Sequence, residues 1–262
     1  MQTDTVKKTL IVALGVCLVC SVLVSSAFVS LKGKQDENRK LDKLKNILIA
    51  GGLYSEGTDI VETYEKSIQP VVVNLKTGVE MKSEECVGLL DPTTFDIKKV
   101  AADPELGLDL TPEQDLAKIK RIPKKMILYK VVKNNEIEKY IFPIYGKGLW
   151  STLWGFIAID KDLHTIKGIT FYEHGETPGL GGEVDNPKWK ASWDGKQAFD
   201  KNGNVKIEVI KSIVNPSEKG AEYKVDGLSG ATLTTRGVSN LVRFWLGKDG
   251  YGPFFRNLKG GA

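Results

Sequence analysis

The stretch that decides the fold is residues 124–173, "KKMILYKVVKNNEIEKYIFPIYGKGLWSTLWGFIAIDKDLHTIKGITFYE". Apolar and polar residues alternate with a period of two, which is typical of half-buried strands. This pattern predicts four strands, over residues 124–132, 139–146, 153–160 and 165–173. The first two are joined by "KNNE" and the last two by "KDLHT". Such short connections require antiparallel neighbours, so the sequence predicts an antiparallel sheet.

Helical patterns surround these strands. The segment "ATLTTRGVSNLVRFWLG" at 231–247 predicts a long helix, because Leu233, Gly237, Leu241 and Trp245 share one face that would pack on the sheet. Three shorter helices are predicted at 34–51, 58–68 and 186–196, the first ending at Gly51-Gly52 and the last with Pro187 near its start. The fold class predicted is therefore α+β, with helices packed on the sheet.

Other segments are less regular. Residues 70–78 and 205–212 are strand-like, whereas the turn signals "DPTT" and "DPELGLDLTPEQ" predict a loop-rich connection over 82–122.

An uncharged run precedes these elements. Residues 9–31, "TLIVALGVCLVCSVLVSSAFVSL", would form a helix of about 34 Å, long enough to cross a hydrocarbon layer of about 30 Å. A cleaved signal peptide is the alternative, with "SSA" before Phe28, but signal cores usually span about 7–15 residues. A lipoprotein is disfavoured because Val19 precedes Cys20. Lysines flank both ends of the run, so charge does not fix its orientation.

Composition excludes several classes of protein. The chain is 41% hydrophobic and 27% charged, which indicates a folded protein. A net charge of +4 without a basic block predicts no nucleic-acid partner. Cys86 is the sole cysteine outside the apolar run, so an internal disulfide is excluded there. With two histidines in the chain, we expect no metal site.

Hydroxyl residues crowd the start of the predicted 231–247 helix, in "DGLSGATLTTRGVSN" at 226–240. Ser229 is predicted as the N-cap, with Thr232 in the first turn. The free N–H groups and positive dipole of a helix start favour an anion. An over-capped helix and a phosphate site both fit these residues.

Two glycine-rich loops lie near the strands. "HGETPGLGGEV" at 174–184 fails the dinucleotide fingerprint, because Val184 replaces the third glycine and no helix opens there. It fits a surface turn or a loop that lays bare backbone against a flat ligand. In "YGKGLWSTLW", Trp150 and Trp154 fit either core packing or the walls of a ring-binding site.

"DGLSGAT" resembles the flavinylation motif of FMN-binding domains in ion-pumping electron-transfer complexes, Asp-Gly-x-Ser/Thr-Gly-Ala-Thr. The resemblance extends to "EHGETPGLGGEV" and "GKGLWSTLWGFIAID". The ending "LGKDGYGPFFRNL" and the N-terminal span are similar to the C subunits of sodium-translocating NADH:quinone reductases. The resemblance covers the span and most of residues 110–262.

The resemblance implies a site. In that family a flavin transferase, using FAD and a divalent metal, joins FMN through its phosphate to the last threonine of the motif, here Thr232. The implied motif residues are Asp226, Ser229, Gly230 and Ala231, and Leu233 and Thr234 after the motif are implied to bind the cofactor too. The implied ring contacts are Lys147, Gly148, Leu149, Trp150, Glu176, Thr177, Leu180 and Gly181. Lys147 would stabilise negative charge on the reduced ring. No catalytic acid, base or nucleophile is expected.

The resemblance also implies an organisation and a function. Residues 1–8 would be cytoplasmic, 9–31 a single-pass inner-membrane anchor, 32–110 a membrane-proximal region and 111–262 a periplasmic FMN-binding domain. The chain would relay electrons within a complex that oxidises NADH, reduces ubiquinone and transports sodium, with the other subunits as partners. The alternatives are the G subunit of an Rnf-type complex, a non-catalytic flavin-binding sensor module, and an anchored structural module that lacks a cofactor.

Overall fold

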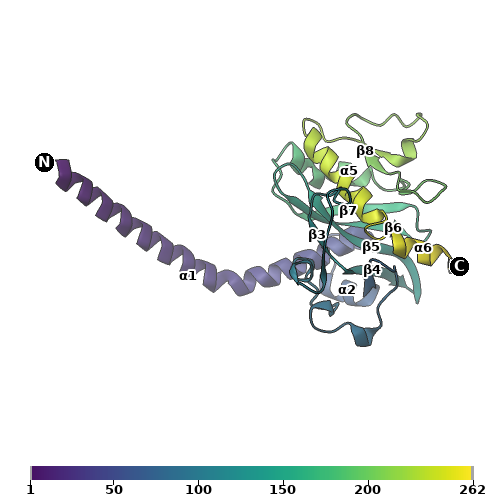
Figure 1. Cartoon of the computed structure of the whole chain (residues 1–262), viewed down its shortest axis with the longest axis horizontal. Coiled ribbons are helices and arrows are strands. Elements are labelled where there is room, and N and C mark those ends of the chain that lie inside the picture. Colours follow the sequence, from purple (N-terminus) through teal and green to yellow (C-terminus); the bar gives the residue numbers. More distant parts are fainter. Residues whose placement is uncertain (1, 261–262) are drawn as a thin grey trace. The chain divides into compact units, whose positions relative to one another are not determined.

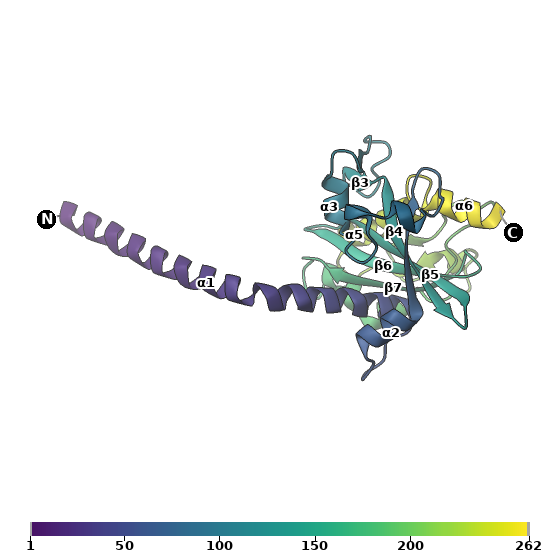
Figure 2. The ribbon, with the colours of Figure 1, turned by 90° about the horizontal axis from the view of Figure 1, so that it is seen from below.

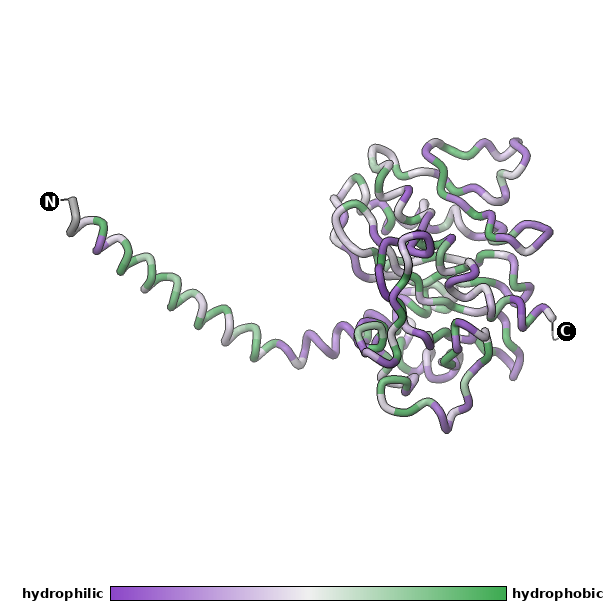
Figure 3. The backbone as a smooth tube through the Cα atoms, in the orientation of Figure 1, coloured by the Kyte–Doolittle hydropathy of each residue, from purple (hydrophilic) through white to green (hydrophobic). Residues whose placement is uncertain are grey.

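The computed structural model describes residues 2–260, which divide into two compact units, Met1–Lys43 and Leu44–Ala262. The helix α1 (Gln2–Gly51) forms the first unit and continues into the second. Its apolar side chains over 9–31 are exposed. The run is long and apolar enough to cross a membrane, and Figure 3 shows the hydrophobic colouring along this part of α1. The predicted N-terminal apolar helix is confirmed, although it does not end where the apolar run ends.

An antiparallel sheet organises the second unit, in the order β1-β4-β5-β6-β7 (Figure 1). Its strands are β1 (Ile68–Asn74), β4 (Lys125–Lys133), β5 (Glu136–Lys147), β6 (Thr152–Asp160) and β7 (Ile166–Glu173). Every neighbouring pair is antiparallel. The four strands predicted from the period-two pattern are confirmed, and the strand-like 70–78 supplies the edge strand β1. The predicted α+β class is therefore correct.

Helices cover both faces of this sheet (Figure 2). On one face, the end of α1 packs on β7, where Thr170 Oγ1 donates to Asn46 Oδ1 at 3.0 Å, and α2 (Ile60–Ser67) packs beside it. On the other face lie α5 (Thr232–Leu246) and α6 (Gly252–Gly260). Successive side chains of β5 point to opposite faces of the sheet. Ile141 lies against the end of α1, whereas the ring of Phe142 packs on the ring of Phe255 in α6. The core is thus a three-layer helix–sheet–helix arrangement.

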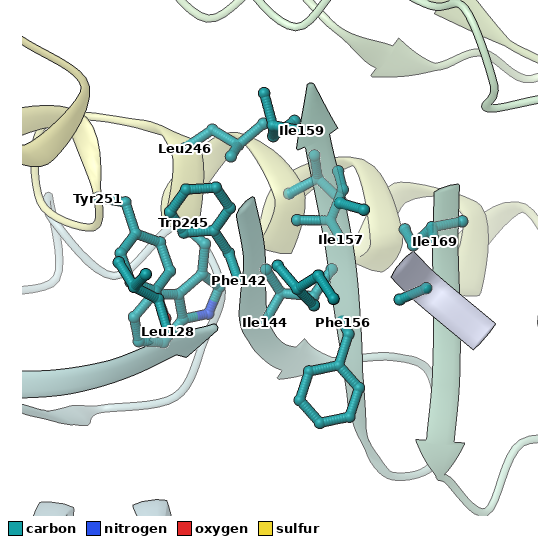
Figure 4. Packing of buried hydrophobic residues seen from close by; sticks show 14 of the residues in the cluster. Leu128, Phe142, Ile144, Phe156, Ile157, Ile159, Ile169, Trp245, Leu246 and Tyr251 are labelled. Atoms are coloured by element: carbon teal, nitrogen blue, oxygen red, sulfur yellow. The ribbon is translucent and has the colours of Figure 1, made fainter. Parts of the chain in front are cut away.

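Two aromatic side chains fill a split between β4 and β5. The pairing of these strands ends at Tyr129 and Ile141, so beyond this point β4 and β5 no longer pair with each other. The Tyr251 hydroxyl lies 3.0 Å from Pro143 O and 3.3 Å from Ile127 O. Trp245 Nε1 donates to Tyr145 O at 2.7 Å. Both rings are fully buried, and they close the core at this point (Figure 4).

Short elements complete the second unit. They are η1 (Ser83–Glu85), η2 (Gly88–Leu90), α3 (Ile97–Ala102), β2 (Gly107–Asp109), β3 (Arg121–Pro123), η3 (Gly181–Asp185), α4 (Pro187–Ala191), β8 (Glu208–Val209), η4 (Ala221–Tyr223) and β9 (Lys224–Val225). The helix expected near Pro187 is confirmed as α4. The strand predicted over 205–212 shrinks to β8, because β9 pairs with two residues of it, in parallel. Residues 44–110 lie in the same compact unit as the sheet.

Removing the hydroxyl that closes the split tests its role. We expect Tyr251→Phe to lower the free energy of unfolding by about 1–2 kcal/mol, because two buried carbonyls lose their partner. Thermal unfolding of the full chain in detergent measures this loss. Tyr223→Phe, at a half-buried tyrosine outside the core, is the control, and equal effects in the two variants would contradict the interpretation.

Candidate functional site

The long helix α5 begins at Thr232, later than the sequence predicted. Its N-cap is Ala231, whose side chain makes no capping hydrogen bond, so the predicted cap at Ser229 is wrong. A turn precedes the helix instead: Ala231 N donates to Leu228 O, and Gly230 has a φ of +69°. This left-handed residue suits glycine and turns the chain into the helix, which begins three residues after Ser229. The first-turn N–H groups of α5 are therefore available to an anion.

Burial sorts the four hydroxyl residues of positions 229–235 into two pairs. Thr234 and Thr235 are buried, with exposed fractions of 0% and 2%. The Thr234 hydroxyl donates to Glu176 Oε2 at 2.6 Å, and the Thr235 hydroxyl accepts from Leu228 N at 3.0 Å. Thr234 thus joins α5 to the Glu176 loop, and Thr235 joins it to the turn at Leu228. The other two residues, Ser229 and Thr232, are exposed.

Asp226 fixes the turn that leads into the helix. Its Oδ1 accepts from Val214 N at 2.7 Å, and its carbonyl accepts from Trp189 Nε1 at 2.9 Å. A Cβ on Gly227 would lie 2.3 Å from Ile210 O, so glycine is required for this close approach. The first two motif residues therefore set the path of the chain.

The Glu176 carboxylate is the centre of the site. Three successive backbone N–H groups donate to it: Leu149 N to Oε2 at 3.1 Å, and Trp150 N and Ser151 N to Oε1 at 3.0 Å each. The Ser151 and Thr234 hydroxyls donate as well. Such a run of N–H groups forms an anion-binding nest. The protein's own carboxylate fills it, which ties the loops 148–151 and 174–182 to the first turn of α5.

These hydrogen bonds set the charge of Glu176, whose exposed fraction is 5%. Burial by itself would raise the pKa of the carboxyl. The hydrogen bonds from the Thr234 hydroxyl and from the N–H groups of Ser151, Leu149 and Trp150 outweigh burial and hold the pKa below its ordinary value. Glu176 is therefore an ionised, buried carboxylate at neutral pH.

Glycines allow the segments to approach Glu176. A Cβ on Gly148 would lie 2.6 Å from Glu176 Oε1, and one on Gly181 would lie 2.5 Å from Thr234 Oγ1. Gly237 of α5 would bring a Cβ to 2.4 Å from Lys147 O. Larger side chains at these three positions would push apart the loops at 148–151 and 174–182, the end of β5 and the helix α5. The glycine-rich patterns in the sequence thus reflect packing around one carboxylate.

Exposed apolar side chains lie on the segments that meet at Glu176 and at the start of α5. The exposed fractions of Leu149, Trp150, Leu180 and Leu233 are 40%, 68%, 43% and 52%. Leu180 lies against Gly230, where an added Cβ would be 2.9 Å from Leu180 Cδ2. We call these four residues the apolar rim. Leu233 does not pack on the sheet as predicted, because the helix start projects beyond the sheet's core, whereas Gly237, Leu241 and Trp245 are buried.

The two tryptophans have different roles. Trp154 stacks on Tyr145, with ring centroids 4.3 Å apart, while Trp150 belongs to the apolar rim. Lys147 Nζ donates to Trp150 O at 2.9 Å, which holds the ammonium group beside the same loop.

The structure brings most of the predicted site residues to one end of α5. Thr177 supports the 174–182 loop through its carbonyl, which accepts from Leu180 N and Gly182 N, and its side chain is exposed. The sequence reasoning missed Ser151 and His174. Ser151 Oγ accepts from Gly175 N, and His174 Nδ1 accepts from Glu176 N while Nε2 contacts Asp185. Ser151 bonds to a residue 24 positions away, and the contacts of His174 depend on how its own loop folds. No spacing in the sequence therefore indicated either residue.

Comparison with known proteins identifies the family. Residues 148–247 match the FMN-binding domain family. The chain is 46% identical over 98% of its length to the C subunit of the Na(+)-translocating NADH-quinone reductase of Pseudomonas aeruginosa, and covers 98% of that protein. The chain belongs to the family of C subunits of sodium-translocating NADH-quinone reductases. The corresponding C subunit of Yersinia pestis is 44% identical over 100% of the chain and 96% of the relative.

Solved structures of such C subunits share this fold. The crystal structure of NqrC from Shewanella oneidensis superposes with a TM-score of 0.74 and 37% identity, over 85% of this chain and 99% of that one. The C subunit from Parabacteroides distasonis has a TM-score of 0.63 and 28% identity, over 86% and 96%. The helix-and-sheet architecture is therefore that of the family, and the family and the apolar helix together support membrane anchoring.

Replacing the central carboxylate of this C subunit tests its role. We expect Glu176→Gln to lower the free energy of unfolding by about 2–3 kcal/mol. The NH₂ group of the glutamine cannot accept the N–H and hydroxyl hydrogen bonds that the carboxylate oxygen accepts. Since the folded pKa is lowered, the stability from Glu176 is present above the ordinary value of 4.5 and lost as pH falls through the folded pKa. Thermal unfolding against pH should therefore show a shallower acid decline in the variant.

The matched control is Glu173→Gln, at a carboxylate 53% exposed in a surface ion pair with Lys98. It should change the free energy of unfolding by less than about 1 kcal/mol. A Glu176 variant as stable as this control would contradict the interpretation.

Proposed function

We propose that this chain is the membrane-anchored flavoprotein subunit of a sodium-translocating NADH-quinone reductase, with FMN bonded through its phosphate to Thr232. It would relay electrons between other subunits of the complex. NADH oxidation, sodium passage and quinone reduction would belong to those partners, because the chain has no dinucleotide fingerprint and a single long apolar helix among its described residues. The family match and the relatives' names support an FMN-carrying electron relay.

The exposure of Thr232 carries the proposal. Just after the motif, Thr234 and Thr235 are buried and engaged with Glu176 and Leu228. An enzyme that attaches a flavin needs access to the oxygen, which those two residues deny. Thr232 is exposed and is the first residue of α5. Resemblance to the flavinylation motif and burial therefore favour the same threonine.

The residues around Thr232 fit both ends of the cofactor. At the helix start, uncapped N–H groups and the positive dipole end suit a phosphodiester. The Glu176 carboxylate occupies the nest of loop 148–151, so that nest is closed to a phosphate. The apolar rim offers exposed hydrocarbon and an indole ring for a flat ring system.

Attachment requires a group transfer from FAD by a flavin transferase with a divalent metal. The Thr232 oxygen forms a bond to the flavin-side phosphorus, the diphosphate bond of FAD breaks, AMP leaves, and the hydroxyl proton passes to the transferase or solvent. The bound flavin then supplies the redox chemistry. Thr232 anchors it, the apolar rim orients it, and Lys147 sets the local charge. By resemblance to the family, we place the domain in the periplasm, with the helix in the inner membrane.

Co-expression with a flavin transferase tests the attachment. The full chain should gain the mass of one FMN residue, and in-gel flavin fluorescence should persist after denaturation. Thr232→Ala should abolish the gain. Thr234→Ser and Thr235→Ser keep the buried hydroxyls and should retain the flavin.

Fragment mass spectrometry then separates Thr232 from Ser229, the other exposed hydroxyl. A flavin on Ser229, or an unmodified wild-type mass, would contradict the proposal.

The charge of Lys147 should raise the flavin's reduction potential. We expect Lys147→Ala to lower it by roughly 50 mV, the effect of one charge across a moderate dielectric. Redox titration of the flavin-loaded chain measures the shift. Lys161→Ala, at the opposite end of β6, is the control. Equal potentials in the wild type and the Lys147 variant would exclude this role.

A further inference from the structure

Arg236 lies on the same face of α5 as Thr232. The helix runs from Thr232 to Leu246, and residues four apart are neighbours on its surface. Helical side chains lean toward the N-terminus, so position 236 directs its side chain toward the turn that carries Thr232. Both residues are exposed. The guanidinium is therefore within reach of any group attached to the Thr232 oxygen.

The charge of Arg236 has no counterpart among residues 2–260. None of the ion pairs of the described residues includes it. Helix α5 itself, "TLTTRGVSNLVRFWL", contains no acidic residue. A cation in the first two turns also opposes the positive end of the helix dipole. The protein thus holds an uncompensated positive charge beside the exposed threonine.

We propose that Arg236 binds the phosphodiester that joins FMN to Thr232. A guanidinium can donate two parallel hydrogen bonds to the non-bridging oxygens of a phosphate, and its planar fork suits this geometry better than an ammonium. Arg236 is then a positioning residue: it fixes the phosphate end while the apolar rim holds the ring. This inference rests on the proposed attachment to Thr232.

The test compares the full chain in detergent with and without flavin, prepared by expression with and without a flavin transferase. The quantity measured is the rise in apparent melting temperature on flavin attachment. Arg236→Ala should reduce that rise by about 1–3 °C, Arg236→Lys should reduce it less, and Arg236→Glu should reduce it most. The flavin-free forms should melt alike, apart from the small effect of the helix dipole.

Arg243→Ala is the matched control. Arg243 is exposed on the same helix, three turns along the same face and about 16 Å from Thr232. The Arg243→Ala variant should show the same rise in melting temperature on flavin attachment as the wild type. The ³¹P resonance of the phosphodiester should shift in Arg236→Ala and stay in place in Arg243→Ala.

The outcomes separate the two proposals. A wild-type chain that gains no flavin mass would overturn both. A wild-type chain that gains the mass, with the same rise in melting temperature and the same ³¹P shift in every variant, would overturn the role of Arg236 alone. The role of Arg236 is supported if only the variants at position 236 reduce the rise in melting temperature, in the order Lys, Ala, Glu, and if their differences from the wild type shrink at high salt.

Discussion

The buried carboxylate of Glu176 is the interaction on which the rest of the site depends. It draws three backbone N–H groups of one loop and a threonine hydroxyl of α5 onto the same two oxygens. A buried charge is tolerated when hydrogen bonds replace its hydration, and the Ser151 hydroxyl completes the set of donors that do so here. The same bonds align a strand end, a glycine-rich loop and a helix start. The apolar rim and the exposed threonine owe their arrangement to this one ionised group.

The sheet could be predicted from the sequence because strand periodicity is a local property. The alternation in residues 124–173 indicated four strands and their antiparallel order, and these agree with β4 to β7. The start of α5 was harder to predict from the sequence. Capping preference favoured Ser229, but the left-handed Gly230 and the bond between Leu228 and Thr235 decide where the helix begins. That bond joins a turn to the helix after it, and composition does not encode it.

The role of Glu176 lay beyond sequence reasoning for a related reason. Its donors stand 25 to 58 residues away in the chain, so spacing alone could not bring them together. The resemblance implied a ring contact for Glu176, and the geometry adds that five protein donors bind its carboxylate. Burial likewise separates hydroxyls that look equivalent in "SGATLTT". Most residues that meet at this end of α5 could be proposed from the sequence, and the packing divides them into those that are buried and those that are exposed.

The last turns of α1 have a consequence for how the chain is processed. Asn46, Ile47, Leu48 and Ala50 are buried in the second unit, and the Gly51 carbonyl accepts from Lys139 Nζ at 2.8 Å. Removal of the apolar run by a peptidase near Phe28 would leave these residues in place. A released chain and an anchored chain would therefore share one core and one flavin spectrum. Fractionation between membrane and supernatant, rather than spectroscopy, distinguishes the two forms.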